Sequence, residues 1–231
     1  MKTLGIVGGI APPSTIEYYK YLIEAYRKKS PGGAYPPVVI NSIDPLRMLG
    51  MINARDYSGT VDYLVSALQT ISGAGVDLAL FASNTPHLLF DEISRRSPLP
   101  LVSIVEAARD EAQRRGYRRV GLLGTGFTMR ASFYRDAFAA EGIALIAPDP
   151  GDIDIVHEKY MGELVPGVLR DETRATILEI IHRMRATNQI DGIVFGGTEL
   201  PLLIPADDYP ELGILDTMRA HVDKTVELML A

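Results

Sequence analysis

Apolar residues along this chain of 231 residues follow two alternating patterns. Short apolar runs that end in glycine or small polar residues predict buried strands, and the spaced apolar positions between them predict amphipathic helices. The predicted strands lie at 3–7, 38–40, 78–82, 101–103, 119–123 and 144–146, with two more beginning at 190 and 213. Alternating strands and helices predict an α/β fold with largely parallel sheets.

One of these strands leads into the clearest candidate for a ligand site. Residues 76–87 read VDLALFASNTPH, an apolar run followed by small polar residues and then by a helical pattern. In open α/β sheets, ligands collect beyond the carboxyl ends of the strands. Unpaired N–H groups at a helix N-terminus favour anions such as carboxylates. We therefore expect a small anionic ligand near Ser83.

A similar sequence pattern occurs again in the second half of the chain. Residues 190–199 read IDGIVFGGTE, and LGIVGG at position 4 is echoed by VGLLGT at position 120. The two shifts, 120 − 4 = 116 and 197 − 83 = 114 positions, are nearly equal and keep the same order. A half-chain unit therefore occurs twice, which predicts two related α/β lobes.

The repeat and the prolines suggest where the lobes divide. Pro98 and Pro100 mark a crossing between them. The last strand and helix have no counterpart left in the second repeat, so we expect them to join the first lobe. The predicted division is 1–98 plus 208–231 for the first lobe and 99–207 for the second.

Composition narrows the class of partner. The formal net charge is −6, the isoelectric point is near 5.3, and no basic run occurs. Nucleic acid and anionic membrane surfaces are therefore disfavoured. No apolar stretch approaches the roughly 20 residues of a membrane span. The pattern indicates a cytoplasmic protein with a small-molecule ligand.

Several familiar site chemistries are excluded by the residues themselves. The chain has no cysteine, so it has no thiol nucleophile and no thiolate metal site. The glycines near position 8 do not form a GxGxxG dinucleotide fingerprint. The aspartates of residues 149–154 lack the spacing of a calcium loop. We expect no metal and no cofactor. Arg47, just past the second strand, is a candidate for holding a carboxylate.

Four segments together resemble the aspartate/glutamate racemase family of cofactor-independent amino-acid racemases. They read GIVGGIAPPSTIEYY at 5–19, SNTPH at 83–87, LLGTGFTM at 122–129 and GGTEL at 196–200. The resemblance implies two pseudo-symmetric lobes with a substrate cleft between them, a small acidic amino acid or dicarboxylate as substrate, and catalysis without pyridoxal phosphate. It points to an isomerase, which we expect to be a homodimer.

The chain departs from the family at the two positions that matter most. Family members normally carry cysteines where this sequence has Ser83 and Gly197. Racemisation needs a base on one face of the α-carbon and an acid on the other, and a serine hydroxyl is a poor base while glycine has no side chain. Two-cysteine racemisation is therefore excluded. The remaining catalytic candidates are Ser83, Glu199 and His87.

Further polar residues in the matching segments are candidates for holding the substrate. They are Arg47, Asn84, Thr85, Thr125 and Thr198. Three alternatives stay open: proton transfer by other groups, a non-catalytic module that binds an amino acid or dicarboxylate, and an inactive racemase altered to remove its thiols. Ordinary cap and turn chemistry would also explain Thr85 and Glu199.

Overall fold

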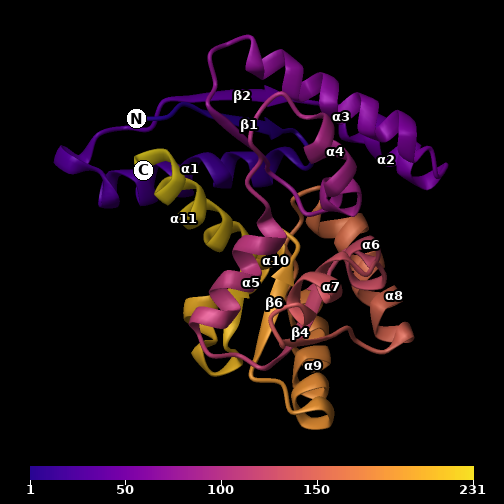
Figure 1. Ribbon diagram of the computed structural model, residues 1–231. Coiled ribbons are helices and arrows are strands. Elements are labelled where there is room, and N and C mark those ends of the chain that lie inside the picture. Colours follow the sequence, from indigo (N-terminus) through magenta and orange to yellow (C-terminus); the bar gives the residue numbers. More distant parts are fainter. The chain divides into compact units, whose positions relative to one another are not determined.

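The computed structural model describes residues 1–231 and divides into two compact units (Figure 1). Unit 1 comprises Met1–Ser103 together with His221–Ala231, and unit 2 comprises Ile104–Ala220. Each unit is built around its own parallel sheet with helices in the connections. The predicted α/β class with parallel sheets is confirmed. None of the helices combines the length and the apolar character that crossing a bilayer requires.

Unit 1 holds a three-stranded parallel sheet of order β2-β1-β3. Leu4 pairs with Val38 on one side and with Leu78 on the other. Its elements are β1 (Leu4–Gly8), α1 (Pro12–Lys29), η1 (Pro31–Gly33), β2 (Val38–Ser42), α2 (Pro45–Asn53), α3 (Tyr57–Ser72), β3 (Leu78–Phe81), η2 (Thr85–Leu89) and α4 (Phe90–Arg96).

The helices of unit 1 follow the apolar spacing of the sequence. In α1, Tyr18, Leu22 and Tyr26 recur at every fourth position and are all buried. Residues at this spacing share one helix face, so burying that face holds α1 in place. The helix α3 does the same with its own stripe, and the Asp56 side chain caps its first turn by accepting a hydrogen bond from the N–H of Gly59.

Unit 2 holds a four-stranded parallel sheet of order β5-β4-β6-β7. Its elements are α5 (Ile104–Arg114), β4 (Arg119–Gly124), α6 (Gly126–Arg130), α7 (Phe133–Ala139), β5 (Ala144–Ile146), α8 (Pro150–Lys159), η3 (Tyr160–Leu164), α9 (Asp171–Asn188), β6 (Gly192–Gly196), α10 (Leu200–Leu203), η4 (Ala206–Asp208), η5 (Pro210–Leu212) and β7 (Ile214–Asp216). The last helix, α11 (Thr217–Leu230), begins in unit 2 and ends in unit 1.

The two sheets repeat one topology. In unit 1, β1 lies between β2 and β3, and in unit 2, β4 lies between β5 and β6. Beyond β3, Leu101 forms a parallel bridge with Ala79, just as β7 pairs in parallel with β6. The internal repeat seen in the sequence is therefore a repeat of strand order as well.

The boundaries of the two compact units differ from those of the predicted lobes. Residues 208–220 were expected in the first lobe, but Ile214 pairs with Ile193 and places β7 at the edge of the second sheet. That edge of β6 would otherwise expose unpaired backbone groups, so it accepts one more strand. Residues 99–103 were expected in the second lobe but belong to unit 1, because Leu101 bridges to Ala79.

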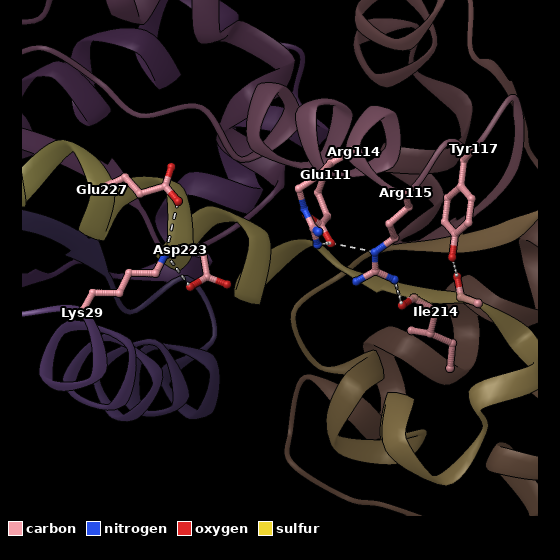
Figure 2. A network of polar contacts seen from close by, with 9 residues as sticks. Lys29, Glu111, Arg114, Arg115, Tyr117, Ile214, Asp223 and Glu227 are labelled. Atoms are coloured by element: carbon pink, nitrogen blue, oxygen red, sulfur yellow. Dashed lines mark hydrogen bonds and ion pairs between the residues drawn. The ribbon is translucent and has the colours of Figure 1, made fainter.

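Polar contacts tie the ends of the repeats into their units (Figure 2). In unit 1, the Lys29 ammonium lies 3.3 Å from the Asp223 carboxylate and 3.2 Å from that of Glu227, which links α1 to α11. In unit 2, the Arg115 guanidinium pairs with Glu111 at 2.6 Å and donates to the backbone carbonyl of Ile214 at 2.8 Å. These contacts attach α11 to the first sheet's helix layer and α5 to β7.

Candidate functional site

The residues singled out in the sequence lie in each unit at the edge where the parallel strands end. In unit 1, Arg47 follows β2, and the segment 83–87 follows β3. In unit 2, Thr125 follows β4, and the segment 197–199 follows β6. The carboxyl ends of parallel strands meet at one edge of a sheet, so each unit gathers its own group of candidate residues, a half-site.

Ser83 in unit 1 is buried, and its hydroxyl takes part in only a weak hydrogen bond. Its side chain is 6% exposed, and Oγ accepts a long hydrogen bond of 3.4 Å from the N–H of Thr85. Asn84 is 4% exposed and accepts the N–H of His87 on its backbone carbonyl at 3.0 Å. Thr85 is half-buried. This turn presents small polar groups, but it places no carboxylate beside the Ser83 hydroxyl that would activate it as a base.

The turn after Ser83 differs from the expected helix N-terminus. The segment forms the five-residue 3₁₀ helix η2, and the α-helix α4 starts only at Phe90. A short 3₁₀ turn aligns few N–H groups and carries little macrodipole. A 3₁₀ turn therefore stands where an α-helix N-terminus was expected, and the binding of an anion at this point stays a prediction.

His87 is buried inside unit 1, which makes it a poor base. It is 3% exposed and stacks on Phe90, with ring centroids 4.7 Å apart. Burial and the nearby His221 lower the pKa of His87 to about 3, although hydrogen bonds with the backbone of Ser83 and Asn84 oppose this shift. Its ring is therefore neutral at pH 7, and its contacts hold the Ser83 turn in place.

His221, for which the sequence suggested no role, is central to unit 1. It is fully buried, its Nε2 lies 2.9 Å from the carbonyl oxygen of Val102, and its Nδ1 lies 2.9 Å from the Tyr18 hydroxyl. Because a carbonyl only accepts, Nε2 carries the hydrogen and Nδ1 accepts from Tyr18. Burial lowers the pKa of His221 to about 4, opposed by the bond to Val102.

The turn after β1 contains two residues with a positive φ. Gly9 has φ of 83° and donates its N–H to the Thr15 hydroxyl at 2.9 Å. Ala11 has φ of 95°, which an alanine rarely adopts. Such strain costs about 1–3 kcal/mol and persists only where surrounding contacts enforce it. The turn is therefore held rigid beside the ends of β2 and β3.

Arg47 lies in the first turn of α2 and is exposed. Its guanidinium carbon lies 4.5 Å above the centre of the Tyr63 ring. The Tyr63 hydroxyl accepts a hydrogen bond from the backbone N–H of Asp44 at 3.1 Å. Stacking on an aromatic ring restrains the guanidinium while leaving its N–H edge open to water. That edge can accept a carboxylate.

In unit 2, the side chain missing at Gly197 leaves room for Tyr160. A Cβ built on Gly197 would lie 2.6 Å from Cε2 and 2.8 Å from Cζ of Tyr160, and closer still to its hydroxyl. No real Cβ tolerates such contacts, so the glycine is needed for the phenol to sit there. Gly197 does not adopt a positive φ, so crowding rather than backbone strain demands the glycine.

Glu199 is buried against Tyr160 and Thr198. It is 3% exposed, its Oε2 accepts from the Tyr160 hydroxyl in a very short hydrogen bond, and the same oxygen accepts from the Thr198 hydroxyl at 3.1 Å. The Tyr160 hydroxyl in turn accepts the backbone N–H of Glu199 at 3.3 Å. Thr198 and Glu199 are therefore brought together as predicted, and Tyr160 joins them.

Tyr160 keeps its proton in this setting. Burial and the adjacent Glu199 carboxylate raise the pKa of Tyr160 well above its usual value of 10.0, and hydrogen bonds from the Glu199 backbone and the Thr198 side chain only partly oppose this. The phenol is consequently neutral at physiological pH and donates to Glu199. Unit 2 thus holds a buried hydroxyl–carboxylate pair at the end of β6.

Thr125 is used as a helix cap rather than in the Glu199 cluster. Its Oγ1 accepts the N–H of Thr128 at 3.3 Å at the start of α6, and it lies 3.2 Å from the Thr128 hydroxyl. The following Gly126 donates its N–H to His157 Nδ1 at 3.1 Å. The capping interpretation, left open for the polar residues of these turns, therefore holds for Thr125.

Two residues of the half-sites, Tyr160 and His221, escaped the sequence analysis. Tyr160 is separated from Glu199 by 39 positions, and His221 from Val102 by 119. Neither lies in a segment that matched the family pattern. The only available signal for Tyr160 was the glycine at 197 itself, because a glycine after a buried strand marks a close approach by another group.

Comparison with known proteins agrees with this architecture. The sequence model of Asp/Glu/Hydantoin racemase matches residues 7–225. A candidate Asp/Glu racemase from Yersinia pestis superimposes with a TM-score of 0.89 at 29% identity, and an aspartate racemase homologue from Pyrococcus horikoshii OT3 superimposes with 0.85 at 35% identity. In both cases all of each chain is covered.

A curated relative is more distant and longer. The glutamate racemase of Aquifex aeolicus is 26% identical over 175 residues, which cover 74% of this chain. The matched region spans 64% of the length of that enzyme, so about a third of the enzyme has no counterpart in the comparison.

Proposed function

This chain belongs to the Asp/Glu/Hydantoin racemase family, and from that premise we propose that it is an isomerase-type enzyme acting on a small acidic amino acid or dicarboxylate. The proposed chemistry is cofactor-independent proton transfer at the α-carbon, without the two cysteines usual in the family. The observation that carries the proposal is the buried Glu199, which accepts two hydroxyl donors at the end of β6.

Among the candidate acid/base groups, Glu199 is better suited than His87 or Ser83. A carboxylate can act as a base, and Glu199 is the one carboxylate among these three candidates. The Ser83 hydroxyl accepts a hydrogen bond from the Thr85 N–H and not from an activating base, and the pKa of about 3 leaves His87 neutral and weakly basic. We assign Glu199 the proton-transfer role, Ser83 a hydrogen-bonding role, and His87 the support of the Ser83 turn.

The proposed substrate class follows from the relatives and from the side chains at the two sheet edges. The relatives are aspartate and glutamate racemases or homologues of them. Arg47 offers a guanidinium for one carboxylate, and hydroxyl or amide groups suit the other polar atoms. We propose Asn84, Thr85, Thr125 and Thr198 as substrate-binding residues in addition to Arg47. A homodimer and a cytoplasmic location remain predictions.

Exchange of the α-hydrogen in deuterium oxide tests this function. L-aspartate, L-glutamate and related dicarboxylates are each incubated with the protein, and the α-proton signal is followed by NMR while chirality is followed by chiral chromatography. We expect loss of the α-proton signal for at least one substrate. Failure of every substrate to exchange would overturn the proposed activity.

The absence of cysteine favours one alternative, a module that binds the same ligands without turning them over. In that case the fold and the polar residues at the sheet edges would be kept, while proton transfer would be lost. Calorimetric titration separates the two functions: saturable binding of a dicarboxylate with no exchange in deuterium oxide indicates the binding module, and binding with exchange indicates the enzyme.

A further inference from the structure

The place of the side chain absent at position 197 is filled by the phenol of Tyr160. The ring carbons Cε2 and Cζ lie 2.6 and 2.8 Å from where a Cβ of residue 197 would stand. The resemblance puts a catalytic thiol on residue 197, so the Tyr160 hydroxyl occupies the space next to where that group would be. A dissociable O–H therefore stands at the position left empty by the glycine.

The backbone places Tyr160 at the C-terminal end of α8. Tyr160 starts the π-helical segment η3, which follows α8 directly. The Val165 N–H donates to the Tyr160 carbonyl at 2.9 Å, a π-turn of the kind that occurs at helix C-termini. Tyr160 is 2% exposed and its hydroxyl both donates to the Glu199 side chain and accepts the Glu199 N–H.

We propose that Tyr160 is the catalytic residue that exchanges a proton with the α-carbon, and that Glu199 stores the proton that Tyr160 gives up. This assignment rests on the proposed function and names the group that touches the substrate. In the forward step the bond between the α-carbon and its hydrogen breaks, and its electron pair stays on carbon. The Tyr160 oxygen takes that proton while the phenolic proton passes to Glu199 Oε2.

The proton balance of this relay avoids a charged tyrosine. Before the step, Tyr160 is neutral and Glu199 is ionised. After it, Tyr160 is neutral again and Glu199 is a carboxylic acid, so the negative charge has moved from Glu199 to the substrate carbanion. In the reverse step Glu199 returns its proton to Tyr160, and Tyr160 protonates the carbon. The raised pKa of Tyr160 fits this role, because a free tyrosinate is never formed.

The relay predicts a particular stereochemical result. It acts from a single group, so it exchanges the α-hydrogen on one face of the carbon. The equivalent turn in unit 1 carries Ser83, whose Oγ accepts a hydrogen bond from the Thr85 N–H and not from an acid. Deuterium should therefore enter the α-position faster than the configuration of the substrate inverts.

Removing each member of the relay tests the proposal. In the substrate that wild-type protein exchanges, Tyr160→Phe should slow α-hydrogen exchange by about 100-fold or more, which is the scale of general acid–base catalysis. Glu199→Gln should do the same, and it keeps the size of the side chain in case Tyr160→Phe does not fold. Tyr134→Phe is the matched control, because Tyr134 is a fully buried tyrosine of the same unit.

The outcomes separate the relay from the proposed function. Slow exchange in Tyr160→Phe and Glu199→Gln, with wild-type exchange in Tyr134→Phe and a folded protein by circular dichroism, supports the relay. Unchanged exchange in folded Tyr160→Phe or Glu199→Gln overturns the relay and leaves the proposed function standing. No exchange by the wild-type protein overturns both. Inversion of configuration at the same rate as α-hydrogen exchange by wild-type protein also overturns the relay as a single-group mechanism.

Discussion

The ends of β3 and β6 occupy equivalent places in the two repeats but hold different chemistry. After β3, Ser83 forms one long hydrogen bond, and the buried histidines His87 and His221 lie in the same unit. After β6, Gly197 has no side chain, and Tyr160 and Glu199 supply a hydroxyl and a carboxylate in its stead. A repeat thus preserves where the backbone turns, while the groups packed against that turn are free to diverge.

The difference also concerns how the buried polar groups respond to pH. In unit 1 the buried groups are neutral imidazoles, which are destabilised when they gain a proton. In unit 2 the buried pair is a neutral phenol donating to a carboxylate. The two half-sites should therefore respond differently to a change of pH.

The largest expected effect is that of acid on stability, and it should come from the buried histidines of unit 1. The folded pKa values of His87 and His221, about 3 and about 4, lie below the unfolded value of 6.5. The contribution of the two neutral histidines to the free energy of unfolding is therefore complete above pH 6.5. It is lost as the pH falls toward their pKa values in the folded protein. Between pH 7 and 5 we expect the free energy of unfolding to fall by about 2 kcal/mol for each histidine, measured by urea denaturation.

A variant of one histidine provides the control for the acid effect. In His221→Gln, the drop in the free energy of unfolding between pH 7 and 5 should shrink by about 2 kcal/mol, although the variant is less stable at pH 7. His182 is the matched residue on the surface of α9, and His182→Gln should leave the pH dependence as it is in the wild type. An unchanged pH dependence in His221→Gln would contradict the account.

Cysteine placed at the two equivalent positions should have unequal effects. Gly197→Cys forces a Cβ into the Tyr160 phenol, and overpacking of this kind costs about 1–3 kcal/mol. Ser83→Cys replaces a hydroxyl by a thiol of similar shape, and we expect a loss below about 1 kcal/mol. Thermal and urea denaturation of the two single variants measures the difference. Equal losses would show that Tyr160 moves aside freely.

The same pair of variants bears on activity. In the double variant, thiols at both positions should supply two ionisable groups, and racemisation of aspartate or glutamate should appear only when both are present. The displaced Tyr160 will lower the yield of folded protein. A folded double variant that binds aspartate without changing its chirality would show that the two half-sites have diverged beyond these positions.

The smallest expected loss of stability is that of a variant at Arg47, a residue outside the two turns compared above. Arg47→Met keeps the stem of the side chain but removes the guanidinium over Tyr63, so we expect stability to fall by about 0.5–1 kcal/mol. Binding of a dicarboxylate should weaken at least tenfold if the guanidinium holds one carboxylate. Calorimetric titration measures this, with Arg55→Met as a control at a nearby exposed arginine. Unchanged affinity would remove Arg47 from the proposed substrate-binding residues.

Local patterns in the sequence determined the α/β class, the repeat and most strand positions. The strands appear as continuous apolar runs, and the stripe of Tyr18, Leu22 and Tyr26 recurs every four residues. Both patterns lie within single elements, so they are recognised without knowing what packs against them. The carboxyl ends of parallel strands meet for a reason of geometry, so the turns at Ser83 and Gly197 were predictable as places where side chains gather.

Only the tertiary structure decided what surrounds these turns. The pairing of β7 with β6, the burial of His221 between Tyr18 and Val102, and the seating of Tyr160 against Gly197 all join residues far apart in the chain. A glycine in a sequence signals that space is needed, but not which group fills it. That depends on how α8 and β6 pack together, because hydrogen bonding and steric fit are set by three-dimensional contacts and not by sequence spacing.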